Sequence, residues 1–157
     1  MKFIVDGACP GNGRRDAIGA AAAVRVYRNG CHSDRACQLN TSECKATNQR
    51  AEILAIVLAL KWAMDIYEKL NNSPRIVVII HSDSRYAVNC MKKWLAKWSR
   101  NKWTTSAGRS VANQDILRDA IDAENRVLDV GKVVYKRVPR KKVFLADKRC
   151  KEVLNNM

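Results

Sequence analysis

The stretch that decides the fold covers residues 47–83 and reads TNQRAEILAIVLALKWAMDIYEKLNNSPRIVVIIHSD. Thr47 is a good helix N-cap, because a threonine hydroxyl can accept a hydrogen bond from the first turn of a helix. The residues after it predict a helix that extends to about Leu70. The early part of this helix is apolar on nearly every face, as expected of a buried helix. Residues 75–81 then form an almost continuous β-branched run, which is typical of a central strand.

Weaker patterns on both sides complete the order of elements. Four more strands are predicted: Lys2–Val5, Ile18–Tyr27, one that ends near Gln38–Asn40, and Lys132–Val138. Further helices are expected within Ser84–Trp98, over Ala112–Ala123 and over Asp147–Leu154. This order predicts an α/β fold, with a five-stranded mixed sheet flanked by helices. A chain of 157 residues suits one domain, so we expect a single domain over residues 1–157.

The charge of the chain points to a polyanionic partner. The net charge is +14 and the isoelectric point is near 9.9, which favours binding that releases counterions. Residues 92–109 contain six basic residues and no acid, with Trp94, Trp98 and Trp103 between them. Basic side chains neutralise phosphate, and aromatic faces pack against sugars and bases. The segment therefore predicts a nucleic-acid-binding surface, although the tryptophans could instead be the core of a small helical hairpin.

Several classes of protein are disfavoured. No uncharged apolar run approaches about 18 residues, so we expect no membrane span and no membrane partner. The first residues lack the apolar core of a secretion signal, so we expect an intracellular location with reduced cysteines. The six cysteines show no close C-x-x-C pair, which leaves zinc binding as a minor alternative. We also expect a monomer.

Three acids stand beside predicted core elements. Asp6 follows the first strand, Asp83 follows the central strand, and Glu52 is the sole acid in the first turns of the long helix. Each alone could be a turn, cap or helix-dipole residue. Together they predict a shared carboxylate site at the rim of the sheet. Clustered carboxylates repel, and Mg²⁺ both neutralises them and binds phosphate oxygens, which fits phosphodiester hydrolysis at a two-metal site.

Five motifs in order resemble the ribonuclease H type 1 family, particularly its eukaryotic form. They are DGAC at 6–9 with NGRR at 12–15, TNQRAE at 47–52, SDS at 82–84, the tryptophans with TSAG at 105–108 and Asn113, and VP at 138–139. The resemblance implies an RNase H-like fold with a basic protrusion. It also implies a Mg²⁺- or Mn²⁺-dependent hydrolase, an endonuclease that cuts the RNA strand of RNA/DNA hybrids.

The same resemblance assigns roles to individual residues. It implies that the metal ligands are Asp6, Glu52 and Asp83. The residues that it implies at the minor groove, where RNA displays its 2′-hydroxyls, are Asn12, Asn48 and Gln49. It implies a DNA-phosphate site at Lys45, Thr47 and Asn113, a DNA-strand channel lined by Tyr86, Trp94 and Trp98, and further DNA-backbone contacts from Thr105 and Ser106.

After Pro139 the sequence departs from the family pattern. In an ungapped alignment Lys141 replaces the histidine of the catalytic loop, Asp147 replaces an asparagine that caps the last helix, and Lys151 replaces the fourth carboxylate. A charged lysine has no acceptor and cannot bind Mg²⁺. We therefore expect Lys151 to lie near Asp6, one ion to be bound rather than two, and cleavage to be weakened.

Two alternatives remain open. A four-residue shift would put Asp147 at the fourth acid position. The chain could also be a pseudoenzyme, an inactive RNase H-like module that binds nucleic acid or a protein. Residues 132–151 contain nine basic residues against one acid, so they are a candidate for additional nucleic-acid-binding surface.

Overall fold

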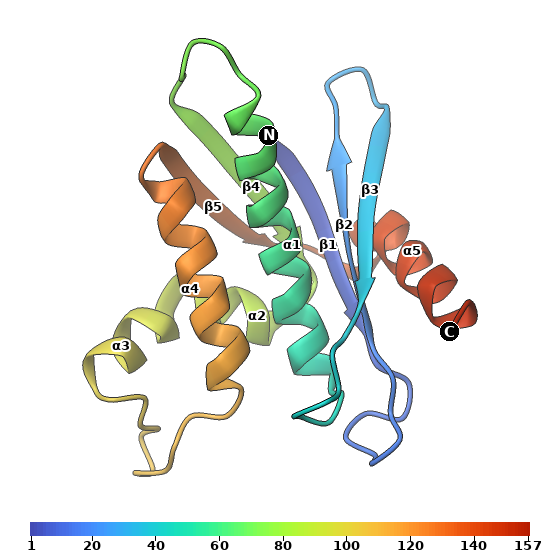
Figure 1. The fold of residues 1–157 in the computed structure, drawn as a ribbon, viewed down its shortest axis with the longest axis vertical. Helices are drawn as coiled ribbons and strands as arrows, with labels where there is room; N and C mark the ends of the chain where they lie inside the picture. The colour runs from blue at the N-terminus through green and yellow to red at the C-terminus, as the bar shows by residue number, and fades with distance from the viewer.

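A five-stranded mixed sheet with the order β3-β2-β1-β4-β5 forms the centre of the computed structural model, which describes residues 1–157 (Figure 1). The strands are β1 (Lys2–Ala8), β2 (Ala20–Val26), β3 (His32–Gln38), β4 (Ile76–Ser82) and β5 (Gly131–Arg137). β1, β2 and β3 pair antiparallel, whereas β4 pairs parallel with both β1 and β5. The mixed sheet predicted from the order of elements is therefore confirmed.

Helices cover both faces of this sheet. They are α1 (Asn48–Glu68), α2 (Arg85–Asn89), a π-helical turn (Cys90–Trp94), α3 (Leu95–Arg100), α4 (Gln114–Leu128), a 3₁₀-helix (Arg140–Val143) and α5 (Phe144–Asn155). α1 and α4 lie side by side on one face, and α5 packs alone on the other face against β1, β2 and β3 (Figure 1). None of these helices is long and apolar enough to cross a bilayer.

The two faces of β2 belong to different cores. Ala21 and Ala23 join the large core beneath α1, while Ala20 and Ala22 pack against Cys150 of α5 and its neighbours. A strand buried on both faces shows no alternation of polar and apolar residues. This explains why the alanine-rich sequence gives only a weak strand pattern.

α4 ends at Leu128 rather than at the expected Ala123, and two boundaries next to the acids also differ from the sequence-based expectations. β1 continues to Ala8, so Asp6 lies inside the strand, opposite Ala22, rather than after its end. α5 begins at Phe144 rather than Asp147, which places Asp147 in its first turn and not at its N-cap. The earlier start follows from the apolar spacing of Val143, Ala146 and Cys150, which are all fully buried and lie on one side of the chain from the end of the 3₁₀-helix through the first two turns of α5.

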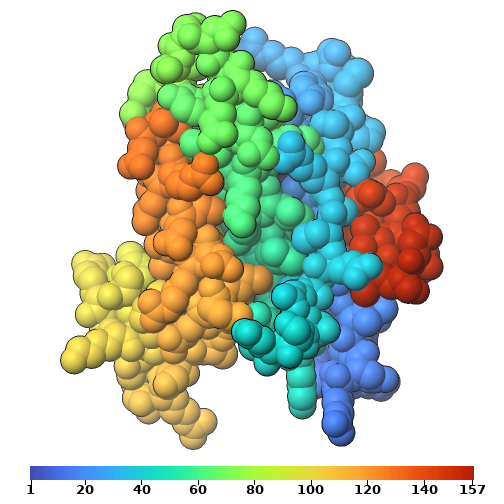
Figure 2. Space-filling view, viewed as in Figure 1, coloured from blue at the N-terminus to red at the C-terminus, as the bar shows by residue number.

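Residues 90–112 form the basic protrusion, which projects from the lower left of the molecule in yellow (Figure 2). Trp103 is buried in the core, while Trp94 and Trp98 are half-buried and form a row with it, with ring centroids 5.7 Å and 6.5 Å apart. The guanidinium of Arg118 stacks on Trp103 at 4.5 Å. Trp103 is therefore a core residue, as the hairpin interpretation expects, whereas Trp94 and Trp98 are partly exposed on the protrusion.

Candidate active site

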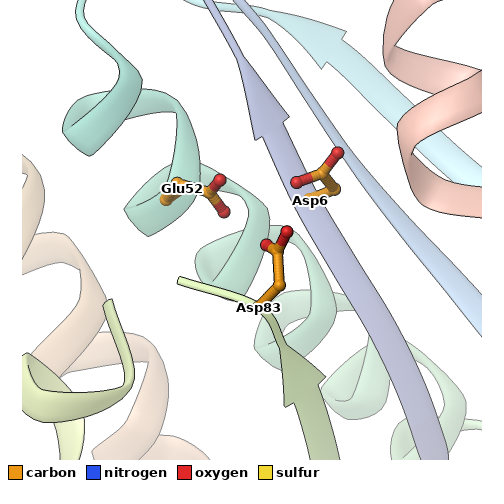
Figure 3. A group of neighbouring side chains, drawn as sticks. All are labelled: Asp6, Glu52 and Asp83. Carbon is orange, nitrogen blue, oxygen red and sulfur yellow. The ribbon is translucent and has the colours of Figure 1, made fainter. Parts of the chain in front are cut away.

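Asp6, Glu52 and Asp83 converge from three elements, and their carboxylates point toward one another (Figure 3). One oxygen of each lies within 4.8 Å of the others. Asp6 comes from β1, Glu52 from the second turn of α1, and Asp83 from the end of β4. β1 and β4 are parallel neighbours, so residues near their carboxyl ends meet at one edge of the sheet.

Gly7 allows α1 to approach β1 closely enough for this convergence. A Cβ atom at Gly7 would lie 2.3 Å from the backbone carbon of Ala51 and 2.4 Å from the backbone nitrogen of Glu52. No side chain fits there unless the helix and strand separate. The absence of a side chain at residue 7 therefore sets the distance between Asp6 and Glu52.

We expect Gly7→Ala to lower the free energy of unfolding by about 3 kcal/mol, because the added methyl group meets backbone atoms that cannot rotate away. Urea unfolding would measure this loss. Gly13→Ala is the matched control, since a Cβ at Gly13 meets nothing within 4 Å and carries only the strain of its positive φ. Equal losses for the two variants would show that the approach of α1 to β1 is not tight.

The electrostatics of the three-acid group favour a bound cation. Burial, together with the charges of Asp6 and Asp83, raises the pKa of Glu52 to about 9. Burial and the charges of Asp83 and Asp147 raise the pKa of Asp6 to about 7. Glu52 Oε2 is buried and has no hydrogen-bond donor. Hard divalent cations bind carboxylate oxygens, so these residues fit Mg²⁺ or Mn²⁺.

A fourth carboxylate, Asp147, lies beside Asp6. A side-chain hydrogen bond between the two contributes to the raised pKa of Asp6. The Asp147 side chain is 17% exposed, whereas that of Lys151 is 65% exposed. Lys151 Nζ lies 2.9 Å from Asp147 Oδ2, so its ammonium pairs with the fourth acid at the rim of the groove. Lys151 also lines this groove, so the assignment of Lys151 to the fourth-acid position by the ungapped alignment stays a prediction.

The position of Cys150 fixes how Asp147 and Lys151 are presented by α5. Its Sγ donates to the backbone carbonyl of Asp6 at 3.3 Å, which fixes the side of α5 that faces β1. Asp147 lies one turn before Cys150 and close to that side. Lys151 lies about 40° further around the helix than Asp147, because four residues exceed one turn by that amount. Its side chain therefore reaches back to Asp147 from the solvent.

The ion pair with Lys151 keeps Asp147 ionised. Burial alone would raise the pKa of Asp147, but the hydrogen bond and charge of Lys151 outweigh burial, and the pKa is lowered. The hydrogen bond with Asp6 and the charge of Arg140 act in the same direction. A proton shared by the two carboxyl groups therefore favours Asp6, because the pKa of Asp6 is raised and that of Asp147 is lowered.

The four acids line one groove of about 490 Å³, and the residues expected at the minor groove lie at its edge. Asn48 and Gln49 line it directly. The backbone N–H of Asn48 donates to Asn12 Oδ1 at 2.8 Å, and Asn48 Oδ1 accepts from the backbone N–H of Cys9 at 3.1 Å. These bonds tie the loop after β1 to the start of α1.

Asn113 links this edge to the protrusion. It adopts a left-handed backbone conformation, with a φ of 65°, just before α4. Its side-chain amide donates to Tyr86 Oη at 3.2 Å and to Gln49 Oε1 at 3.4 Å. The Tyr86 ring lies 6.2 Å from that of Trp94. The aromatic row is therefore continuous with the groove.

The remaining residues expected to contact the DNA strand are exposed or form local hydrogen bonds within their own segment. Thr47 caps α1 by accepting from the backbone N–H of Arg50 at 3.2 Å, and Lys45 is exposed two residues earlier. Thr105 Oγ1 accepts from the backbone N–H of Arg109 at 3.1 Å, so this hydroxyl serves a turn in the protrusion, next to exposed Ser106.

Sequence reasoning missed Arg140 as part of the site. It lines the groove beside the acids, although the sequence marks it only as one of many basic residues after Pro139. Its nearness to Asp147 depends on the 3₁₀-helix that precedes α5, and the sequence gives no separate signal for that turn.

Comparison with known proteins identifies the family. The RNase H family model matches residues 1–133. The ribonuclease H of Moorella thermoacetica is 37% identical over 127 residues, 80% of this chain and 72% of the relative. That of Syntrophomonas wolfei is 33% identical over 139 residues, 81% of this chain and 80% of the relative. The chain belongs to the RNase H family.

Solved structures show the same fold. The RNase H1 of the archaeon Halobacterium salinarum has a TM-score of 0.61 at 22% identity, with 99% of this chain and 98% of that chain covered. A foamy viral protease–reverse transcriptase, solved in complex with an RNA/DNA hybrid, has a TM-score of 0.74 at 17% identity over 99% of this chain and 20% of that chain. The family match ends at residue 133, so Arg140, Asp147 and Lys151 lie beyond it.

Proposed function

We propose that this chain is a divalent-metal-dependent endoribonuclease that cuts the RNA strand of RNA/DNA hybrids. The observation that carries the proposal is the convergence of Asp6, Glu52 and Asp83 in one groove, with Glu52 Oε2 buried and without a donor. Family membership and the basic surface support the same reaction class. The solved relative that was captured with a hybrid supports the substrate.

Asp6, Glu52 and Asp83 would hold Mg²⁺ or Mn²⁺. Bound ions would supply an activated water and stabilise the leaving oxygen of the scissile phosphate. The protein itself provides a rigid arrangement of oxygens, since Gly7 and Cys150 fix α1 and α5 against β1. Asp6 must lose its proton for two ions to bind, and cation binding lowers the pKa of a carboxylate ligand.

We further propose that Asp147, and not Lys151, acts as the fourth carboxylate. Its place beside Asp6 and its ion pair support this role, because the pair keeps the carboxylate ionised while leaving it at the groove. The Lys151 side chain is largely exposed and can swing away when a cation competes for Asp147. Surface ion pairs contribute only about 0–1 kcal/mol, so this competition is weak.

The residues around the groove fit a hybrid duplex. Asn12, Asn48 and Gln49 present amide groups at the edge where RNA 2′-hydroxyls would lie. On the protrusion side, Tyr86, Trp94 and Trp98 offer aromatic faces to the sugars of the DNA strand. Lys45, Thr47 and Asn113 are the proposed phosphate site for that strand. Thr105 and Ser106 would add backbone contacts.

We expect the chain to bind an RNA/DNA hybrid more tightly than double-stranded DNA of the same sequence, by about tenfold, the scale of one to two kcal/mol for a few hydrogen bonds. The reason is that only RNA offers 2′-hydroxyls to the three amides. Fluorescence anisotropy in EDTA at near-physiological salt would measure both affinities. In the double variant Asn12→Ala/Gln49→Ala, the affinities for the hybrid and for double-stranded DNA should become similar. Equal affinities of the native chain for the two duplexes would refute the preference.

A second function, hybrid binding without cleavage, is favoured by one observation: the ammonium of Lys151 already occupies one side of Asp147. A cleavage assay on a hybrid labelled in the RNA strand separates the two functions. We expect RNA-strand cleavage in Mg²⁺ or Mn²⁺ that stops in EDTA. Tight binding with no cleavage in either metal would establish the non-catalytic alternative.

A further inference from the structure

Four basic residues at the end of β5 and in the following 3₁₀-helix form a surface that is here named the C-terminal basic cluster: Arg137, Arg140, Lys141 and Lys142. All four are exposed, and none makes a side-chain hydrogen bond or ion pair. By contrast, Arg35, Arg126 and Arg149 each pair with a surface carboxylate.

The absence of ion pairs makes this cluster different from an ordinary solvated face. Four like charges within six residues repel one another, and none of them forms an ion pair, although Arg140 lies beside the acids of the groove. A polyanion would relieve this repulsion and would release counterions on binding.

The location of the cluster relates it to the acidic groove. Arg140 lines the groove together with Asp6 and Asp147, and the 3₁₀-helix packs against β1 and β4. The basic protrusion leaves the groove on the side of α1 and α4, whereas the 3₁₀-helix leads into α5 on the opposite face of the sheet (Figure 1). The acids therefore lie between two basic surfaces.

We propose that the C-terminal basic cluster is a second phosphate-binding surface, which holds the strand being cut on the side of the groove away from the protrusion. The proposal rests on the proposed function, because it takes the polyanion to be the RNA/DNA hybrid. A phosphate next to the scissile one comes within reach of Arg140. The phosphates beyond it would pass over Arg137, Lys141 and Lys142.

The chemistry of the cluster favours the sugar–phosphate backbone over the bases. Arginine binds phosphate oxygens in pairs, and lysine acts as a mobile point charge. The open depression beside Arg137 is lined only by Arg137, Val138 and Pro139, so no aromatic side chain lines it, and the exposed aromatic nearest in sequence is Phe144 at the start of α5. We therefore infer binding that depends on charge and not on sequence.

The test compares two variants with the same loss of charge. One carries Arg137→Gln, Lys141→Gln and Lys142→Gln, which leaves Arg140 and the four acids in place. The control carries Arg28→Gln, Lys69→Gln and Arg75→Gln, three exposed cations in the loops at the opposite end of the sheet. Hybrid binding is measured by fluorescence anisotropy in EDTA, where no cleavage occurs, over a series of salt concentrations.

We expect the cluster variant to bind the hybrid roughly tenfold more weakly near physiological salt and its log–log salt slope to fall by about 2 to 3, close to one per lost phosphate contact. The control should change affinity by less than about twofold and leave the slope unchanged. Lys142→Glu alone should act in the same direction, which guards against misfolding of the triple variant. Equal slopes for the cluster and control variants would overturn the proposal.

The same measurements separate this proposal from the proposed function. If the native chain binds no hybrid, the function itself fails. If it binds the hybrid and the cluster variant binds equally well, only the second surface fails. Co-sedimentation with phosphatidylserine vesicles tests whether the cluster binds an anionic membrane surface instead. A cluster variant that loses vesicle binding but keeps hybrid binding would assign these residues to a membrane surface and overturn the proposal.

Discussion

Glu52→Gln is expected to lower Mg²⁺-dependent cleavage of a hybrid by about three orders of magnitude, the scale on which loss of a central electrostatic group slows an enzyme. Glutamine keeps the size of the side chain but not its charge. Its loss removes one of the three carboxylates that converge in the proposed metal site. Rates measured under single-turnover conditions would show the effect on the chemical step. Unchanged cleavage would remove Glu52 from the active site.

The same substitution should stabilise the metal-free protein. The pKa of Glu52 is raised to about 9 in the folded state, whereas the pKa of an unfolded glutamate is near 4.5. Between these values the folded state binds more protons than the unfolded state, so the free energy of unfolding falls as the pH rises through this window. Glutamine does not titrate and avoids this loss. In EDTA at pH 8 we expect Glu52→Gln to be about 1–3 kcal/mol more stable than the native chain, with a smaller difference at pH 5.

Glu68→Gln is the matched control for this experiment. Glu68 is an exposed residue at the end of the same helix, where it pairs with Arg126. It should change neither cleavage nor the pH dependence of unfolding. Saturating Mg²⁺ should stabilise the native chain and the control but not Glu52→Gln, because ligand binding to the folded state adds to its stability. Equal stabilisation of all three proteins would place the cation elsewhere.

Asp147→Asn is expected to lower Mg²⁺-dependent cleavage by about 100-fold, since it removes a charged oxygen from the side of Asp6. The fold should be little affected. The ion pair between Asp147 and the exposed Lys151 contributes no more than about 1 kcal/mol. The free energy of unfolding measured in urea should therefore change by no more than that. A large loss of activity with a small loss of stability is the signature of a group that acts at the site.

Glu152→Gln provides the control on the same helix. Glu152 is exposed and pairs with Arg149, away from the groove. Its cleavage rate should stay within about twofold of the native rate, as is usual for a surface substitution. If Asp147→Asn also stayed within that range, the fourth carboxylate would have no part in the reaction.

Two of the three elements that carry the central acids could be predicted because each has a strong local signal. The apolar run after Thr47 and the β-branched residues 76–80 predict α1 and β4 without knowledge of the rest of the chain. Glu52 and Asp83 follow from those two elements. The end of β1 is predicted too early, because a strand that is covered on both faces shows no alternation of polar and apolar residues. Asp6 nevertheless lies with the other two acids, as expected.

The choice between Asp147 and Lys151 for the fourth position could not be made from the sequence, for a physical reason. Both Asp147 and Lys151 fit the apolar periodicity of α5, because they lie four residues apart and share nearly the same side of the helix. What distinguishes them is the depth at which Cys150 packs against Asp6 and the 3₁₀-helix that precedes α5. These are tertiary features, and the loop after Pro139 has no local pattern that reveals them.

In the protrusion, too, some features could be predicted from the sequence and others could not. Its charge could be predicted from composition, and so could its aromatic character. Which tryptophans face solvent could not, because Trp103 is held in the core by a positive-φ turn and by Arg118 from α4. That contact joins residues that are 15 positions apart and belongs to the tertiary fold.

The most direct test of the central claim is the rate of Mg²⁺-dependent cleavage of a labelled hybrid by the native chain and by Lys151→Asp, measured side by side. With Asp147 as the fourth carboxylate, the native chain should cleave the RNA strand. Lys151→Asp should be no faster, because a new acid at the rim only repels Asp147. A native chain without Mg²⁺-dependent cleavage, together with a Lys151→Asp variant that gains it, would contradict the claim and return the fourth position to residue 151.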